Sequence, residues 1–213
     1  VITTFFLGTG IGQLIMGPLS DALGRKTVIL GGLLIYMAGC VMAIYVGSLE
    51  WLLAARFIQG VGVSAPRTVA MALIRDLYSG RPMARVMSLA MTLFVLVPAI
   101  SPLMGQWIMT TFGWRSIFVA FILFAIIGFL WLGLRQPETH PVELRQPMRL
   151  KPYFVAMREV AMNRVVMTYT LAMSLSYGAL FAYLSSAQQL YVETYNAGTS
   201  FPLYFAGIAI ISG

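Results

Sequence analysis

The residues of this chain that could support chemistry are a few charged side chains within or beside long apolar runs. Arg56 and Gln59 lie less than one helical turn apart inside one such run. A charged side chain inside a membrane-length run costs on the order of 3 kcal/mol unless it is paired or hydrated. Two interpretations are open for Arg56. Its guanidinium extends to the outer membrane surface, or it faces a central cavity with Gln59 on the same polar face.

A second group of charges lies between two apolar runs, in the segment Gly-Pro-Leu-Ser-Asp-Ala-Leu-Gly-Arg-Lys at residues 17–26. Asp21 beside Arg25 and Lys26 offers an ion pair that is weak when solvated and can therefore form and release. Gly17 and Gly24 permit a tight turn between closely packed helices. Taken alone, this segment is a charged hairpin.

Residues that would support enzyme chemistry do not gather in this sequence. His140 is the only histidine, and Cys40 is the only cysteine. No Cys/His cluster has the spacing of metal ligands, and no glycine-rich phosphate-binding motif occurs. We therefore expect no enzyme, metal, cofactor or ATP-driven transport, and we interpret Cys40 as a small buried or lipid-facing residue.

The composition indicates a membrane protein. Hydrophobic residues make up 59% of the 213-residue chain and charged residues 10%, against about 25% charged in soluble domains. The net charge is +7, but the basic residues form short clusters between apolar runs. Such clusters set membrane topology, and they do not form the phosphate-neutralising surface that nucleic-acid binding requires.

The apolar runs predict transmembrane helices, each of which needs roughly 20 residues. They are too long and too continuous for strands. The predicted spans are 1–19, 27–46, 51–74, 86–110, 116–134, 165–184 and 201–213. Glycines at 8 and 12, and at 31, 32 and 39, would let helix backbones approach closely.

A polar segment of about thirty residues, 135–164, separates the first five spans from the others and contains four prolines. We therefore predict three parts: a helical block at 1–134, a linker at 135–164, and the start of a second block at 165–213. Within the linker, Tyr153–Arg164 is amphipathic enough to lie along the membrane surface.

The basic residues also predict the orientation. Eleven of the 14 Lys and Arg residues fall in the loops at 20–26, 75–85 and 135–164, and only Arg115 falls in the opposite loops. These three loops are therefore expected in the cytoplasm. Four tryptophans near span ends fit interfacial anchors. Val1 would then begin on the outer side, so a cytoplasmic N-terminus needs one more helix before it. Because both ends of the chain fall within apolar runs, we expect a fragment cut at both ends.

Two motifs identify a family. The pattern G-x-L-x-D-x-x-G-R-K at residues 17–26 resembles the signature loop between helices two and three of the major facilitator superfamily. The pattern R-x-x-Q-G-x-G from Arg56 to Gly62 resembles the helix-four motif of the same superfamily. In that family the arginine is implicated in proton coupling, so the resemblance assigns coupling to Arg56 and Gln59.

A third segment, Val97–Gly105, contains Pro98, Ser101, Pro102 and Gly105. Prolines inside a span remove backbone hydrogen bonds and bend the helix. Glycines of the antiporter motif are replaced here, and the proline-rich version resembles the bicyclomycin/chloramphenicol-resistance branch of drug:proton antiporters. The segments Arg-Asp-Leu-Tyr at 75–78, Gly-Trp-Arg at 113–115, Pro-Glu-Thr at 137–139 and Phe-Ala-Tyr-Leu-Ser at 181–185 resemble that branch too.

The gating networks of this family suggest a cytoplasmic charge cluster in the present chain. Its expected members are Asp21, Arg25, Lys26, Asp76 and Arg85. Arg67 follows Pro66 two turns before Asp76. It either reaches the cytoplasmic surface, alone or in an ion pair, or lines the cavity.

The resemblance implies a twelve-helix, all-α membrane protein of two six-helix bundles. This chain would supply helices two to six, the linker, helix seven and part of helix eight. The implied function is proton-coupled efflux of small hydrophobic compounds by alternating access, by a monomer in the bacterial inner membrane. No acidic residue lies within a predicted span, so we expect the proton-carrying acid on the preceding helix. An uptake symporter, a membrane sensor or scaffold, and a membrane enzyme are the alternatives, although the polar cluster that an enzyme needs is missing from the spans.

Overall fold

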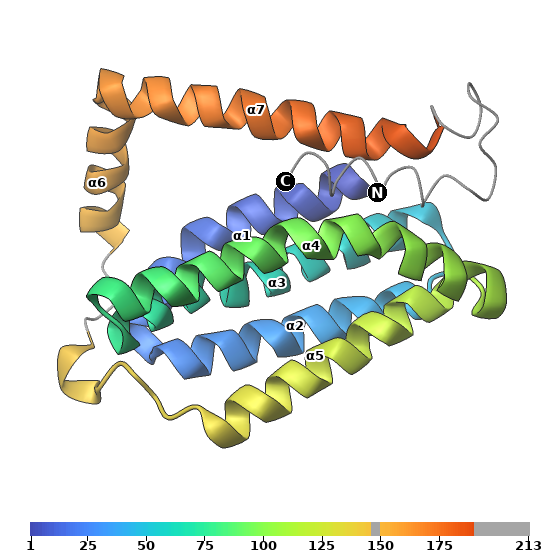
Figure 1. Ribbon diagram of the computed structural model, residues 1–213, viewed down its shortest axis with the longest axis horizontal. Coiled ribbons are helices and arrows are strands. Elements are labelled where there is room, and N and C mark those ends of the chain that lie inside the picture. Colours follow the sequence, from blue (N-terminus) through green and yellow to red (C-terminus); the bar gives the residue numbers. More distant parts are fainter. Residues whose placement is uncertain (146–149, 190–213) are drawn as a thin grey trace. The chain divides into compact units, whose positions relative to one another are not determined.

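The computed structural model describes residues 1–145 and 150–189. The chain divides into two compact units, Val1–Met148 and Arg149–Gly213. Over the described residues, every regular element is a helix (Figure 1). The all-α fold predicted from the uninterrupted apolar runs is therefore confirmed.

The described part of the first unit, residues 1–145, contains five long helices and one turn of 3-10 helix. They are α1 (Ile2–Leu23), α2 (Arg25–Ile44), α3 (Leu49–Leu77), α4 (Gly80–Phe112), α5 (Arg115–Arg135) and η1 (Val142–Leu144). Among the described helices α1, α2, α3 and α5 are long and apolar enough to cross a membrane. Helix α4 contains the predicted span 86–110, and the predicted span 201–213 lies outside the described residues.

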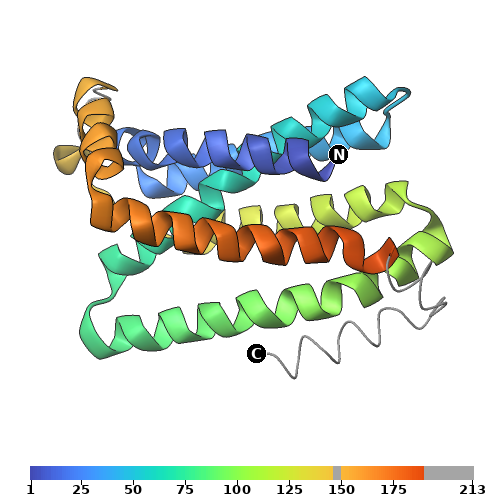
Figure 2. The same cartoon turned by 90° about the horizontal axis from the view of Figure 1, so that it is seen from above.

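Helix α3 is the centre of the first unit. It packs along both α1 and α2, and α5 packs against the other side of α2. Figure 1 shows α2 and α5 side by side, and Figure 2 gives the same helices from above. The apolar core has two parts. One joins α1, α2 and α3 around Val28, Ala65 and Val69, and the other joins α2, α3 and α5 around Cys40 and Phe118.

Glycines set the distance between α3 and its neighbours. A Cβ on Gly60 would collide with the carbonyl oxygen of Phe5 and would lie 2.8 Å from the backbone nitrogen of Thr9 on α1. A Cβ on Gly62 would meet α2, 2.7 Å from the carbonyl oxygen of Gly32. Backbones can approach this closely only where both surfaces carry small residues. The two glycines of the R-x-x-Q-G-x-G motif therefore face different helices.

The glycines predicted for packing behave in two ways. A Cβ on Gly8 would collide with the backbone of Phe57 on α3, and one on Gly39 would lie 2.8 Å from the Gln59 backbone nitrogen. Gly12 and Gly32 also face α3. By contrast, a Cβ on Gly31 would meet nothing within 4 Å. Four of the five glycines thus serve close packing.

The turn between α1 and α2 is shorter than predicted. Helix α1 continues to Leu23 and α2 starts at Arg25, so Gly24 alone connects them. Gly24 has φ of +101°, a backbone conformation that side chains other than glycine rarely adopt. Gly17, which we expected in the turn, lies inside α1, where apolar residues extend the helical pattern. The tight-turn function therefore falls to Gly24 only.

Helix α4 continues from Gly80 to Phe112 through the proline-rich segment. Pro102 and Gly105 are partly buried, Ser101 is exposed, and the side chain of Pro98 lies outside the described set. The Ser101 hydroxyl donates a hydrogen bond of 2.7 Å to the carbonyl oxygen of Val97. No described side chain of α4 is fully buried. The bending function of this segment stays a prediction.

The described part of the second unit consists of α6 (Leu150–Met162) and α7 (Arg164–Gln189). The side-chain oxygen of Asn163 accepts hydrogen bonds from the backbone N–H groups of Val165 and Val166, at 3.1 and 3.2 Å. Asn163 is thus the N-cap of α7. Helix α6 covers most of the amphipathic segment that was predicted at 153–164, and α7 contains the predicted span 165–184.

We predict that Gly60→Ala destabilises the first unit, because its new methyl group must displace the backbone of α1. Overpacking of this kind costs about 1–3 kcal/mol. The measurement is thermal unfolding of the purified full-length protein in detergent. Gly10→Ala is the matched control, since Gly10 is exposed on α1 and a Cβ there meets nothing within 4 Å. Equal unfolding temperatures for the two variants would contradict the packing argument.

Candidate functional site

Two groups of contacting side chains in the first unit are candidates for function, and each is centred on an arginine. The junction cluster lies where α1 ends and α2 begins, and comprises Ser20, Asp21, Arg25 and Asp76. The Arg56 network lies among α1, α2, α3 and α5, and comprises Phe5, Cys40, Arg56, Gln59 and Phe118. Of the predicted site residues, the junction cluster contains Asp21, Arg25 and Asp76, and the Arg56 network contains Arg56 and Gln59.

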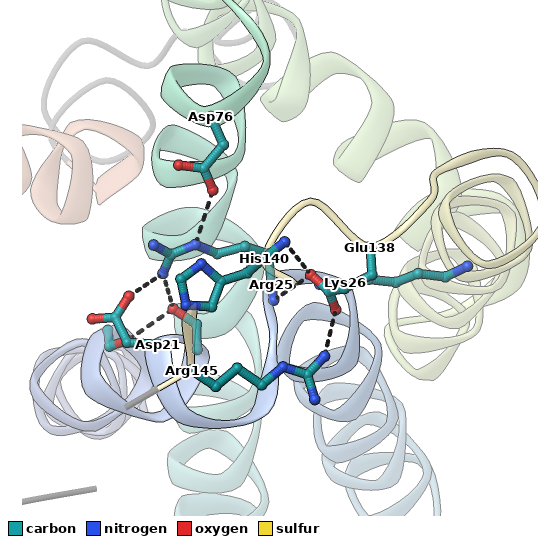
Figure 3. Close-up of polar contacts among 9 residues, drawn as sticks. Asp21, Arg25, Lys26, Asp76, Glu138, His140 and Arg145 are labelled. Carbon is teal, nitrogen blue, oxygen red and sulfur yellow. Dashed lines mark hydrogen bonds and ion pairs between the residues drawn. The ribbon is translucent and has the colours of Figure 1, made fainter. Parts of the chain in front are cut away.

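The Arg25 guanidinium is the centre of the junction cluster. Its Nη1 atom lies 2.6 Å from Asp21 Oδ1 and donates to Ser20 Oγ at 2.6 Å, and its Nε atom donates to Asp76 Oδ2 at 3.2 Å. Figure 3 shows the guanidinium between the two carboxylates. Because Asp21 belongs to α1, Arg25 to α2 and Asp76 to α3, one cation ties the ends of three helices together.

Exposure differs strongly among the members of the junction cluster. The Arg25 side chain is 13% exposed, whereas Asp76 is 30% and Asp21 is 54% exposed. The cation is therefore held in the protein, and the acids lie on its solvated rim. A solvated ion pair contributes at most about 1 kcal/mol. Breaking one pair leaves Arg25 with its other acid and with Ser20, so the guanidinium is never left unpaired.

Lys26 and Arg85, both predicted for the charge cluster, lie outside it. The Lys26 ammonium donates a 2.7 Å hydrogen bond to the carbonyl oxygen of Gly133, near the C-terminal end of α5. Carbonyl groups in the last turn of a helix have no partner within the helix, and a cation there is favourable. Arg85 is exposed on α4, and it forms no ion pair within residues 1–145.

Glu138 adjoins the junction cluster, although no function was predicted for it from the sequence. Its Oε1 atom accepts hydrogen bonds from the backbone N–H groups of Arg25 at 2.9 Å, Lys26 at 3.5 Å and His140 at 3.1 Å. Its Oε2 atom lies 4.0 Å from Arg145 Nη2. These contacts bring the segment after α5 to the start of α2.

The environment of Glu138 lowers its pKa below the ordinary carboxyl value. Burial alone would raise this pKa, but the N–H groups of His140, Arg25, Lys26 and Thr27 together lower it further than burial raises it. Because the pKa of Glu138 is lower in the folded state than in the unfolded chain, its carboxylate stabilises the fold at pH values above the ordinary carboxyl pKa. That stabilisation is lost as the pH falls through the lowered value. Glu138 is therefore ionised at neutral pH.

The Arg56 network holds a cation inside the helix bundle. Arg56 Nη1 donates to Gln59 Oε1 at 2.9 Å, and Gln59 Nε2 donates to Cys40 Sγ at 3.0 Å. The guanidinium carbon lies 4.7 Å from the centre of the Phe5 ring and 6.0 Å from that of Phe118. A cation over an aromatic face is stabilised electrostatically. Gln59 and Cys40 are completely buried.

This geometry bears on the two interpretations of Arg56. Its hydrogen bond to Gln59, three residues further along α3, and its contacts with rings on α1 and α5 place the guanidinium among the helices. No carboxylate pairs with it within the described residues, and its Nε atom is buried without a hydrogen-bond partner there. The arrangement favours an interior cation over one that extends to the membrane surface.

Some contacts were left open by the sequence, as for Arg67, and others were not anticipated from it. Arg67 is exposed on α3 and forms no ion pair in the described part of the chain. Ser20, Cys40 and the two phenylalanines were not predicted as partners of the arginines. Ser20 lies within the first motif and could have been considered from its position. The partners of Cys40 and Glu138 come from distant segments, and the sequence carries no signal for such pairs.

The comparison with protein families gives one result over the full length. The profile of the Major Facilitator Superfamily matches residues 1–213. A bicyclomycin resistance protein homolog from Haemophilus influenzae is 31% identical over 211 residues, which cover 99% of this chain and 53% of that protein. The chloramphenicol resistance protein CraA of Acinetobacter baumannii is 33% identical over 173 residues, covering 80% of this chain and 41% of CraA.

A third relative, multidrug resistance protein D of Escherichia coli, is 34% identical over 154 residues, which cover 72% of this chain and 39% of that protein. The chain thus spans about half the length, or less, of the curated relatives that it matches. The relatives agree with the branch that the sequence motifs resemble, and the predictions of a multi-pass membrane protein and of a transporter instead of an enzyme are confirmed at the level of the family. This chain belongs to the Major Facilitator Superfamily.

Proposed function

We propose that the protein containing this chain exports small hydrophobic compounds in exchange for protons, by alternating access. The observation that carries the proposal is the position of Arg56. It is a cation among transmembrane helices, held by an amide and two aromatic rings, with no carboxylate partner in the described residues. The names of the three relatives, each a resistance protein or a homolog of one, favour export over uptake.

The proposed function of Arg56 is electrostatic. A fixed positive charge in a low-dielectric site stabilises the ionised form of any acid that comes near it and so lowers the proton affinity of that acid. Such an acid would release its proton as it moved toward Arg56 and would bind one as it moved away. Gln59 holds the guanidinium in one orientation, and Cys40 in turn holds Gln59. Arg56 and Gln59 are thus the proposed coupling pair.

The proposed function of the junction cluster is gating. Rocking of two bundles requires contacts at their ends that break at low cost. Asp21 is the most exposed member of the cluster, so it is the one that we expect to exchange partners during the cycle. Arg25 would remain fixed by Ser20 and Asp76. Pro98 and Pro102 on α4, with Ser101 and Gly105, are proposed to allow bending of that helix.

The orientation follows from the distribution of positive charge. We place the loops at 20–26, 75–85 and 135–164 in the cytoplasm, because they contain eleven of the 14 basic residues. The junction cluster would then be a cytoplasmic gate. We further propose a monomer in the bacterial inner membrane, with the first five helices in one bundle, residues 135–164 as linker and residues 165–213 beginning the second bundle.

Transport assays in everted membrane vesicles that contain the full-length protein test the direction of flux. We expect labelled chloramphenicol to accumulate when the vesicle lumen is acidified, and to leave when an ionophore collapses the gradient. Vesicles from cells without the protein are the control. Proton-driven loss of the drug from preloaded vesicles would indicate a symporter and would contradict the efflux proposal.

We predict that Arg56→Ala reduces proton-driven drug accumulation by about tenfold or more, the factor that corresponds to one hydrogen bond to a charged group. Arg56→Lys keeps the positive charge but loses the planar guanidinium group that donates to Gln59, so we expect the transport activity of this variant to be intermediate. Arg75→Ala is the control, since Arg75 is an exposed arginine of the same helix. A sensor or scaffold function would leave flux unchanged in Arg56→Ala.

We predict that Asp76→Asn lowers the rate of transport but leaves thermal stability within about 1 kcal/mol, because Arg25 keeps Asp21 and Ser20. Stability is measured by unfolding in detergent and transport in vesicles, on the same preparation. Glu50→Gln is the matched control, an acid in the first turn of the same helix. Wild-type transport by Asp76→Asn would remove this residue from the gate.

A further inference from the structure

The start of α2 lacks a cap of its own. The first N–H groups of any helix have no acceptor within the helix, and a side chain at the preceding position usually supplies one. That position is Gly24, which has no side chain to offer. The acceptor comes instead from Glu138, 113 residues after Arg25 in the sequence, through hydrogen bonds of 2.9 Å from Arg25 N–H and 3.5 Å from Lys26 N–H.

Gly24 leaves room for this distant cap. A Cβ at position 24 would collide with Glu138 Oε2 and would lie 2.8 Å from Arg145 Nη2. An ordinary capping residue such as serine or aspartate would therefore displace the carboxylate. A negative charge at this place also interacts favourably with the positive end of the α2 helix dipole. Both the space and the electrostatic field at the start of α2 suit a carboxylate from elsewhere.

A second contact caps the end of α5 from the start of α2, in the opposite direction to the Glu138 cap. Lys26, in the first turn of α2, donates to the carbonyl oxygen of Gly133 near the end of α5. Glu138, just after α5, accepts from the start of α2. We name this pair of contacts the reciprocal clasp. Figure 3 shows Glu138 beside the start of α2 with Arg25 and Lys26, and Arg145 near the other carboxylate oxygen.

Arg25 belongs to both the reciprocal clasp and the junction cluster. Its backbone N–H donates to Glu138, while its guanidinium contacts Asp21, Ser20 and Asp76. The side chain therefore extends from a backbone position that Glu138 holds. A shift of the first turn of α2 would move the guanidinium relative to Asp76. The 3.2 Å contact with Asp76 is the longer of the two ion pairs that Arg25 forms.

We propose that Glu138 is a positioning residue for the gate: by capping α2 it holds Arg25 where its guanidinium can pair with Asp21 and Asp76. The segment after α5 is then a part of the gate and not only a connection to the second bundle. The transport consequence of this inference rests on the proposed function, whereas the cap itself does not.

Hydrogen exchange of the full-length protein, followed by mass spectrometry of peptides that cover residues 25–30, measures the cap directly. We expect Glu138→Ala to speed amide exchange there by at least about tenfold. Glu138→Gln keeps a neutral acceptor of the same length, so we expect about threefold. Glu143→Ala is the matched control, because Glu143 is an exposed acid in the same segment, on η1.

Vesicle transport by the same variants measures the consequence. We expect drug accumulation to fall by about fivefold in Glu138→Ala and less in Glu138→Gln, with no change in Glu143→Ala. Wild-type exchange in both Glu138 variants would overturn the cap, and faster exchange with unchanged transport would overturn the positioning of the gate. If Glu138→Ala does not fold, Glu138→Gln alone decides both questions. Absence of transport by the wild-type protein would instead refute the proposed function, and the exchange experiment would still test the cap.

Discussion

Close backbone contact between α3 and its two neighbours is the constraint on which the rest of the first unit depends. Lipid removes the hydrophobic driving force that holds helices together in water, so association in a membrane relies on van der Waals packing and interhelical hydrogen bonds. Gly60 brings α3 against α1, and Gly62 brings it against α2. Because the backbones are so near, even short side chains on the facing helices come within hydrogen-bonding distance.

The two arginines of the candidate sites both lie between closely packed helices, but they are stabilised in different ways. Arg25 lies at a helix junction and has two acids and a hydroxyl as partners. Arg56 lies within α3 and has an amide and two aromatic faces in place of an acid. A cation that has acidic partners can form and break ion pairs between helix ends at low cost. A cation without an acidic partner remains available to a titrating acid, as coupling requires.

The helices and the family could be predicted from the sequence because their signals are local. Apolar runs of membrane length determine helices wherever lipid is the solvent, and the two motifs are each contained in ten residues or fewer. The pairing of Arg25 with Asp76 was also anticipated, through the resemblance. The Glu138 cap and the Gln59–Cys40 hydrogen bond were not, because each joins segments whose proximity results from packing. Likewise, Gly17 looks like a turn residue in isolation, yet the helical pattern around it continues to Leu23.

The spacing of the R-x-x-Q-G-x-G motif can now be explained by geometry. Arg56 and Gln59, three residues apart, share a face and hydrogen-bond to each other. Gly60 and Gly62 are not on one face, and each admits a different helix. The contact at Gly60 brings α1, and with it the Phe5 ring, to Arg56, whereas the contact at Gly62 brings α2, and with it Cys40, to Gln59. The glycines therefore assemble the surroundings of the arginine, so a side chain at either position would disturb Arg56 without touching it.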